Sequence, residues 1–143
     1  ASEGAVEAYI HPGSKLGVLV ELNCETDFVA KTDDFKELSK NLAMQIAASN
    51  PTVVRREDLD PEVVKRELEI YREQARNENK PEKILDKIAE GKLEKYYQEV
   101  CLMEQIYIKD SKQTVKDILT EAASKLGENM MIGRFARFRL GDK

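Results

Sequence analysis

The sequence predicts a two-layer α+β fold, and three features of the 143-residue chain carry that prediction. A β-hairpin pattern opens the chain at residues 4–24, four stretches with helical spacing follow, and a strand pattern closes it at residues 129–140. A sheet built from a hairpin and one further strand needs cover on at least one face, and the helices can supply it. We therefore expect a small antiparallel three-stranded sheet with helices on one side.

The hairpin is predicted from its turn and from the pattern of its second strand. Pro12 presets φ and Gly13 tolerates positive φ, so residues 11–15 suit a tight turn. After the turn every second residue is apolar, which indicates one buried face. The residues on that face are Leu16, Val18, Val20, Leu22 and Cys24.

The next element is predicted to be a helix that begins after Thr32. Thr32 suits the N-cap, and the two aspartates that follow it suit the positive end of the helix dipole. Apolar residues then recur at helical spacing: Phe35, Leu38, Leu42 and Ile46. Asn50-Pro51 ends the helix, and residues 51–60 read as a connecting loop.

A helical hairpin is predicted over residues 61–104, as a subdomain that projects from the body. Asp60-Pro61 is a typical helix start, and the first helix should reach about residue 78. The second should run from Leu85 to Met103, interrupted or weakened at Gly91. Ten acids and nine bases between residues 61 and 99 suit a solvated outer surface.

One more helix and a strand complete the predicted fold. Thr114 should cap a helix that stops at Gly127. In the closing strand, alternation places Met130, Ile132, Phe138 and Leu140 on one face and Phe135, Arg137 and Arg139 on the other. A three-stranded sheet has two edges that invite pairing, so we expect a homodimer.

Composition narrows the possible partners. With 27 acids against 23 bases the net charge is -4, so no direct nucleic-acid partner is expected. No apolar run approaches the roughly 20 residues of a membrane span, so no membrane partner is expected either. The cysteines suit free thiols in a reducing interior, and we expect a cytoplasmic protein.

The sequence also lacks the usual signatures of bound groups. Two cysteines and one histidine at wide spacing are too few for a structural zinc site, and no glycine-rich phosphate loop occurs. We therefore expect no metal and no cofactor. Two alternatives stay open: a thiol-dependent enzyme that uses Cys24 with His11, and RNA binding through the arginines of the last strand. Core packing is the simpler role for Cys24 and for Cys101, which is expected in a helix.

The stretch "LNCETDFVAK", residues 22–31, places an aromatic ring among charged residues just past a strand. The residues alone favour a helix start, in which Thr26 caps the helix and Asp27 meets the helix dipole. In that interpretation Phe28 packs back under the sheet.

The same stretch resembles the signature of bacterial elongation factor Ts, the guanine-nucleotide exchange factor for elongation factor Tu. The opening "AYIHPGSKLGVLVELN" and the later "REDLDPEVVKRE", "YIKDSKQTVKDIL" and "LGENMMIGRFARF" are similar to successive segments of that family. They occur in family order and cover essentially the whole chain, which makes the resemblance more specific than the triplet Thr-Asp-Phe alone.

The resemblance implies a function and a set of site residues. The partner would be elongation factor Tu, and Thr26, Asp27 and Phe28 would form a wedge. Asp27 and Phe28 would enter between helices of the GTPase domain, near the magnesium and phosphate side of the nucleotide site. His11 matches a family position near the same contact, supplied in a dimer by the other subunit. No bond is made or broken, so we expect neither catalytic residues nor an enzyme.

The resemblance also bears on domain organisation. The family carries an N-terminal three-helix module that has no counterpart here, and the chain starts at Ala1. We therefore expect residues 1–143 to form a single core domain that dimerises and lacks that upstream module. Short family members supply two core halves from two subunits, some with a linking cysteine where this chain has Ala136, so here dimerisation would rest on packing. The alternative is a dimeric binding module without exchange activity once truncated.

Overall fold

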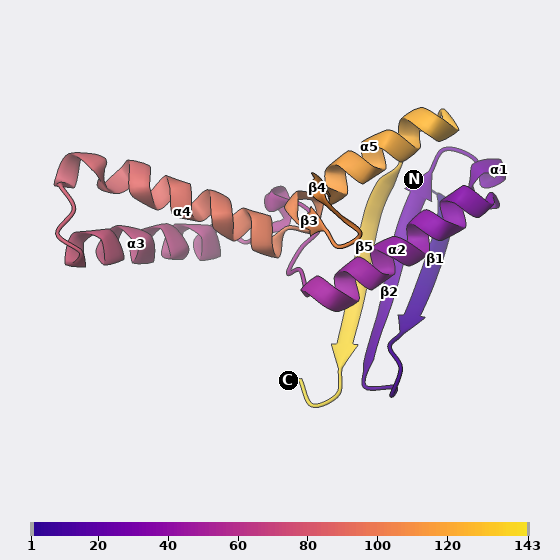
Figure 1. The fold of residues 1–143 in the computed structure, drawn as a ribbon, viewed down its shortest axis with the longest axis horizontal. Coiled ribbons are helices and arrows are strands. Elements are labelled where there is room, and N and C mark those ends of the chain that lie inside the picture. The colour runs from indigo at the N-terminus through magenta and orange to yellow at the C-terminus, as the bar shows by residue number, and fades with distance from the viewer. Residues whose placement is uncertain (1, 143) are drawn as a thin grey trace.

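The computed structural model describes residues 2–142 and shows a two-layer body from which a pair of helices projects (Figure 1). The strands are β1 (Glu3–Ile10), β2 (Leu16–Cys24), β3 (Ile106–Tyr107), β4 (Asp110–Thr114) and β5 (Met131–Arg139). The α-helices are α1 (Asp27–Ala30), α2 (Asp33–Ser49), α3 (Pro61–Asn77), α4 (Leu85–Val100) and α5 (Val115–Leu126). Short 3₁₀ helices lie at Arg56–Asp58, Glu82–Ile84 and Leu102–Glu104.

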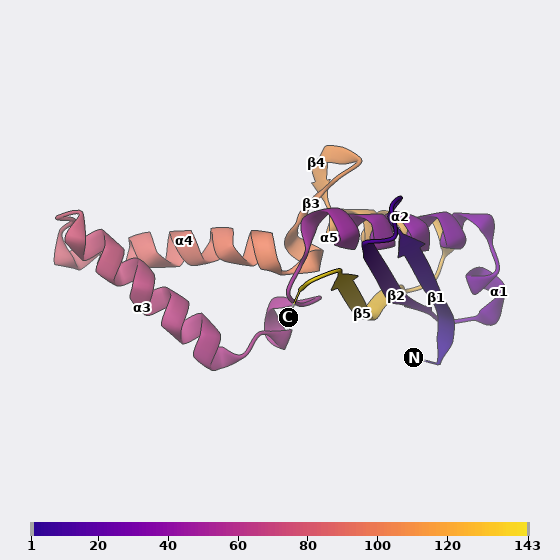
Figure 2. The same ribbon diagram turned by 90° about the horizontal axis from the view of Figure 1, so that it is seen from below.

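The main sheet has the order β1-β2-β5, and both pairings are antiparallel. This confirms the predicted hairpin with a returning C-terminal strand. The helices α2 and α5 cover one face of the sheet, as the view in Figure 2 shows. Within residues 2–142 no helix covers the other face, so the α+β class and the one-sided arrangement are both confirmed.

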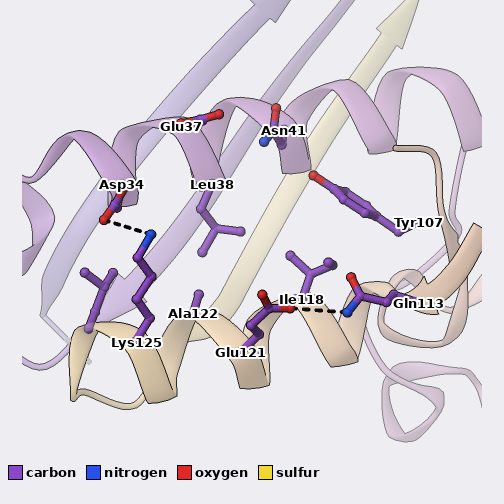
Figure 3. Close-up of a pocket in the computed structure, with 11 residues that line it drawn as sticks. Asp34, Glu37, Leu38, Asn41, Tyr107, Gln113, Ile118, Glu121, Ala122 and Lys125 are labelled. Carbon is purple, nitrogen blue, oxygen red and sulfur yellow. Dashed lines mark hydrogen bonds and ion pairs between the residues drawn. The ribbon is translucent and has the colours of Figure 1, made fainter. Parts of the chain in front are cut away.

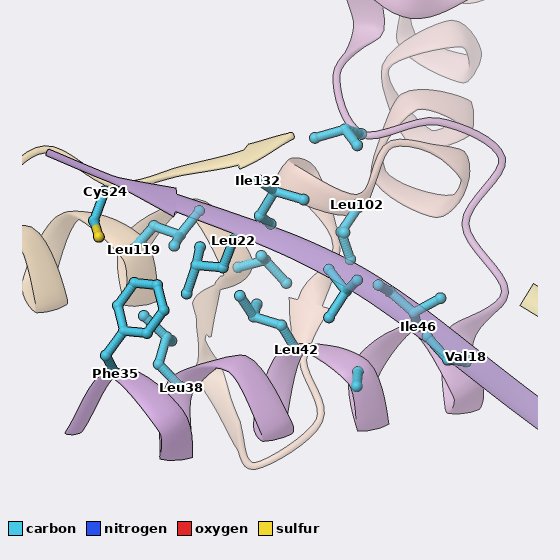
Figure 4. Close-up of a cluster of buried hydrophobic side chains, with 14 of the residues drawn as sticks. Val18, Leu22, Cys24, Phe35, Leu38, Leu42, Ile46, Leu102, Leu119 and Ile132 are labelled. Atoms are coloured by element: carbon cyan, nitrogen blue, oxygen red, sulfur yellow. The ribbon is translucent and has the colours of Figure 1, made fainter. Parts of the chain in front are cut away.

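The core lies between β2 and the helices, and it uses the predicted residues (Figure 4). Val18 and Leu22 point from the central strand toward the apolar face of α2, and Val20 is buried in the same cluster. The three bulkiest buried side chains of α2 meet them there: Phe35, Leu42 and Ile46. β2 is the middle strand of the sheet, and its buried side chains hold it in place. They therefore set where the segment directly after its C-terminal end begins.

The boundaries of α2 follow the predicted cap signals. The Oγ1 atom of Thr32 accepts a hydrogen bond of 3.2 Å from the backbone N–H of Phe35, which satisfies one orphan donor of the first turn. At the other end Asn50 adopts a left-handed conformation with φ of 47°, and Pro51 follows. Both ends of the helix are thus set by local chemistry.

The projecting helices α3 and α4 differ from the prediction in two ways. The predicted interruption at Gly91 is wrong: α4 runs through it, since packing along α3 offsets the roughly 1 kcal/mol that an internal glycine costs. The predicted helix over Cys101 is also wrong. Cys101 is extended and buried, so that the next two N–H groups can bond to the carbonyls of Val53 and Val54.

Two features of the strands were also missed. The short hairpin of β3 and β4 had no signal in the pattern used. The predicted parity of the last strand is wrong, because a bulge shifts the register of β5 between Ile132, opposite Leu22, and Arg134, opposite Glu21. Ile132 therefore faces the core while Phe138 faces outward. The extra residue is Gly133, where a Cβ would collide with the side chain of Glu21.

The base of the projecting hairpin is held by one arginine. The guanidinium of Arg56 donates to the carboxylates of Glu94 on α4 and Glu104 in the adjacent 3₁₀ turn. It also lies 4.1 Å from the centroid of the Tyr97 ring, within range of a cation–π interaction. Arg56 thus joins the loop before α3 to the C-terminal part of α4.

We expect Arg56→Met to lower the free energy of unfolding by about 1 kcal/mol, because the network is partly solvated and exposed ion pairs contribute little individually. Urea unfolding followed by circular dichroism measures the change. The matched control is Arg72→Met, which removes an exposed pair with Asp86 on the same hairpin. Equal stability of the two variants would contradict the role given to Arg56.

Candidate partner-binding site

The chain turns from β2 into α1 within two residues, and Thr26 makes that turn. Its backbone is extended (φ −129°, ψ 150°), and its Oγ1 atom accepts a hydrogen bond of 3.3 Å from the N–H of Val29. The thiol of Cys24 donates to the carbonyl of Thr26 at 3.1 Å. The predicted helix start at Thr26 is therefore confirmed.

The helix α1 is a single turn with one buried and one exposed side. Val29 and Ala30 belong to the hydrophobic core. The hydroxyl of Thr32 donates to the carbonyl of Val29 at 2.7 Å, so the end of the turn is also fixed. Successive helical residues point about 100° apart, so burying residues 29 and 30 directs residues 27 and 28 outward.

Phe28 is 81% exposed, so the interpretation in which it packs under the sheet is wrong. The ring that does fill that position is Phe35, which is fully buried on α2. Burial of a phenylalanine side chain stabilises by roughly 1.5–3 kcal/mol. Because Phe28 gains almost none of this within its own chain, that free energy remains available for contact with another molecule.

The surroundings of Phe28 are polar and carry both signs of charge. Asp27 and Lys31 form an ion pair of 2.9 Å across one helical turn. The hydrogen bond to Asp27 raises the pKa of Lys31 above its ordinary value. Both side chains are exposed, so the pair is weak and can exchange for contacts with a partner. The site is therefore an exposed aromatic ring on a single helical turn with charged neighbours.

A glutamate from a distant part of the sequence also contacts the two residues just before α1. The carboxylate of Glu128, in the loop between α5 and β5, accepts hydrogen bonds from Glu25 and from Thr26. Glu128 was not among the site residues predicted from the sequence. Glu128 stands just after the predicted helix stop at Gly127, and no local pattern indicates that its carboxylate reaches residues about 100 positions earlier.

His11 lies far from the other three predicted site residues. It occupies the β1–β2 turn, where its Nδ1 atom is 2.8 Å from the hydroxyl of Tyr9. Phe28 follows the opposite end of β2, and a nine-residue strand is about 27 Å long. In Figure 1, α1 and the β1–β2 turn lie at opposite ends of the sheet. One chain therefore brings Thr26, Asp27 and Phe28 together and leaves His11 at the other end.

The two cysteines are poorly suited to thiol chemistry. Both are buried, and burial raises the pKa of Cys24 above its ordinary value and that of Cys101 to about 11. Each thiol therefore stays protonated at neutral pH, whereas the nucleophile is the thiolate. His11, the base considered for Cys24, is at the opposite end of β2. The structure thus does not assemble a nucleophile–base pair from these residues.

The groove between α2 and α5, shown in Figure 3, holds about 250 Å³. Its polar side chains pair with one another: Lys125 lies 3.4 Å from Asp34, and Gln113 donates to Glu121 at 3.2 Å. Leu38 and Ile118 line its apolar part. Neither cysteine nor His11 lines the groove.

Two further features are absent from the part of the chain that the structure describes. Across residues 2–142 no group of three or more histidine, cysteine or acidic residues is arranged to hold a metal ion. No helix within the same range is both long and apolar enough to cross a membrane.

Comparison with known proteins identifies the family. A family model described as elongation factor TS matches residues 1–142. The chain is 59% identical over 142 residues to elongation factor Ts of Heliobacterium modesticaldum, covering 99% of this chain and 66% of that protein. It is 60% identical to elongation factor Ts of Anaeromyxobacter sp. strain K, covering 99% and 65%. It is 58% identical to that of Moorella thermoacetica, covering 99% and 70%.

These matches place the chain in an elongation factor family. The chain belongs to the elongation factor Ts family, as the resemblance predicted. It spans about two thirds of the length of the curated relatives it matches.

The buried, protonated thiols lead to a labelling prediction. At pH 7.5 the folded protein should react with N-ethylmaleimide at least about tenfold more slowly than the same chain in guanidinium, because both sulfurs are enclosed and protonated. Mass spectrometry after timed quenching measures the rates. Ser14→Cys, in the exposed β1–β2 turn, is the reactive control. If Cys24 is labelled as fast as this introduced cysteine, the enclosed state is refuted.

Proposed function

We propose that this chain binds elongation factor Tu and promotes the release of GDP, with Asp27 and Phe28 as the inserted element. The observation that carries the proposal is the 81% exposure of Phe28 within the stretch that carries the family resemblance. An exposed ring on a fixed turn is a typical anchor for a partner pocket, because aromatic side chains bury much area with few torsions to restrict. The proposal places the chain in the cytoplasm, where elongation takes place.

Insertion of the ring would act on the nucleotide by shifting populations. A ring that fits only the nucleotide-free arrangement of the GTPase favours that arrangement by its own binding free energy. The coupling is reciprocal, so GDP weakens binding of the factor as much as the factor weakens binding of GDP. At roughly 1.5–3 kcal/mol for one ring, the shift is about one to two powers of ten. A larger effect would need the rest of the interface.

The fixed turn supports this role, because it reduces the entropy lost on binding. Thr26 caps the turn, Val29 anchors it in the core and Thr32 closes it. A side chain presented on a pre-organised backbone retains more of its contact free energy as affinity. In this mechanism the factor forms no covalent bond, so the chain acts as a binding protein, without catalytic residues.

We also propose that the open face of the sheet pairs with the same face of a second copy. Rows of side chains cross this face: Val6 beside Glu21 and Arg134, Ala8 beside Leu19 and Ala136, and Ile10 beside Gly17 and Phe138. Phe138 is 75% exposed, and Val6, Ile10 and Leu19 are also exposed. Two such sheets packed face to face form a sandwich, and a dyad makes each patch its own complement.

The dimer would also account for His11. A dyad perpendicular to the strands reverses the strand direction between the two copies. The β1–β2 turn of one copy would then approach the α1 end of the other, so that His11 of one copy would lie near Phe28 of the other although the length of β2, about 27 Å, separates them in one chain. Ala136, where some short members have a linking cysteine, lies in the central row of this face beside Leu19. The contact would therefore rest on packing alone.

A dimeric binding module without exchange activity is the second candidate. It is favoured by the exposed apolar side chains of the open sheet face, including Leu19 and Phe138, which suit a second copy. Binding and exchange can be measured separately, so the two candidates can be distinguished. Association with elongation factor Tu that leaves GDP release unchanged would support the binding module.

We expect Phe28→Ala to reduce stimulated GDP release by about tenfold to a hundredfold, because the variant loses most of one buried ring in the complex. Release of a fluorescent GDP analogue from elongation factor Tu measures the rate, with circular dichroism as the folding control. Ile106→Ala removes an exposed apolar side chain elsewhere and should match the parent. Equal rates for Phe28→Ala and the parent would refute the wedge, and loss of the fold would instead indicate a packing role.

Leu19→Lys should convert the dimer to a monomer, because it places a charge at the centre of the proposed sheet–sheet contact. Leu19 is exposed in the single chain, so the variant should still fold. Sedimentation velocity at micromolar concentration gives the mass, and Ile106→Lys is the matched control. A parent that sediments as a monomer would contradict the dimer, as would a variant that remains a dimer.

A further inference from the structure

We propose that Glu128 is a positioning residue for Phe28. Its carboxylate holds the segment before α1 in the one conformation that directs the ring outward. This inference rests on the proposed function, which concerns Phe28 itself, and it adds a residue from the loop between α5 and β5.

Three donors from the β2–α1 segment converge on the Glu128 carboxylate. Oε1 accepts from the backbone N–H groups of Glu25 at 3.2 Å and Thr26 at 3.1 Å. Oε2 accepts from the hydroxyl of Thr26 at 2.6 Å. Hydrogen bonds to a charged acceptor are stronger than neutral ones.

A fourth bond returns in the other direction. The carboxylate of Glu25 accepts from the backbone N–H of Asn129 at 3.0 Å. The two loops therefore bind each other reciprocally, with a glutamate from each accepting from the backbone of the other. Neither loop can move outward without breaking bonds to a charged oxygen.

The arrangement also orients the cap of α1. Because the Thr26 hydroxyl donates its O–H to Glu128, a lone pair of its oxygen is turned to accept from the N–H of Val29. A four-residue helix is not stable by itself, since forming the first turn is unfavourable. Fixing Thr26 therefore fixes the start of the turn, and the direction of Asp27 and Phe28 follows from it.

Glu128 is itself well supported. Gly127 ends α5 in a left-handed conformation with φ of 75°, and its N–H donates to the carbonyl of Ala123. Four residues after Glu128 the chain is anchored again by Ile132, which is fully buried in the core. Glu128 thus lies on a short loop between two packed elements, α5 and β5. Through its hydrogen bonds it restrains the turn that carries Phe28.

The test is a double-mutant cycle between Glu128→Ala and Phe28→Ala, measured as stimulated GDP release from elongation factor Tu. We expect Glu128→Ala to reduce release by about fivefold to tenfold, as loss of charged hydrogen bonds at a partly solvated site should. In the Phe28→Ala background the same change should have no further effect. Glu128→Gln keeps two acceptor sites on one oxygen and should recover part of the loss. Glu121→Ala, on α5, is the control and should match the parent.

A second measurement does not depend on exchange activity. Amide hydrogen exchange of the free protein should speed up at Glu25, Thr26 and Val29 in Glu128→Ala and stay unchanged in Glu121→Ala, with the melting temperature as the folding control. Unchanged exchange at these amides would overturn the positioning role, whatever the activity of the parent.

The two proposals fail in different ways. If Phe28→Ala releases GDP as the parent does, the wedge fails, while the amide measurement still decides whether Glu128 fixes the turn. If Phe28→Ala loses activity but Glu128→Ala keeps it, the wedge stands and the positioning role is overturned. A loss from Glu128→Ala that persists in the Phe28→Ala background would show that Glu128 acts through another contact, which also overturns it.

Discussion

The structure depends on one constraint at the end of β2: a single helical turn must bury Val29 and Ala30 while its first two residues face solvent. Four residues complete little more than one helical turn, so burying the last two places the first two on the opposite, exposed side. The threonines at 26 and 32 satisfy the orphan groups of this short turn and fix its two ends. Exposure of Phe28 is therefore a consequence of the packing around it, and the ring does not need the freedom of a flexible loop to reach a partner.

The two faces of the main sheet have different roles. The covered face forms the core with α2 and α5 and so holds the turn that carries Phe28. The open face presents apolar side chains from all three strands, including Val6, Leu19 and Phe138, and is the face that we propose pairs with a second copy. A dimer built on that face would bring one end of β2 in one copy close to the opposite end of β2 in the other. His11 of one copy and Phe28 of the other could then contact elongation factor Tu together, although they are far apart in one chain.

Much of the fold was predictable, because its signals are local. The caps at Thr32 and Thr114, the start at Pro61 and the stop at Gly127 all appear where the residue chemistry places them. The failures were of a different kind. The bulge at Gly133 depends on side chains of a neighbouring strand. The chain leaves the helix at Cys101 because Leu102 and Met103 bond to residues almost 50 positions earlier. At the site, Thr26 was predicted as a cap, but the direction of Phe28 depends on which ring fills the core, and the contact of Glu128 depends on tertiary structure alone.

We propose that Phe28 leaves solvent for a pocket on nucleotide-free elongation factor Tu. Fluorine NMR of the chain labelled with fluorophenylalanine tests it directly, because the four phenylalanines include the exposed Phe28 and the buried Phe35. The account predicts that the Phe28 resonance shifts when nucleotide-free elongation factor Tu is added and returns when GDP and magnesium are supplied, while the Phe35 resonance stays in place. A Phe28 resonance that does not move, in a sample where association is shown by a change in mass, would contradict the account.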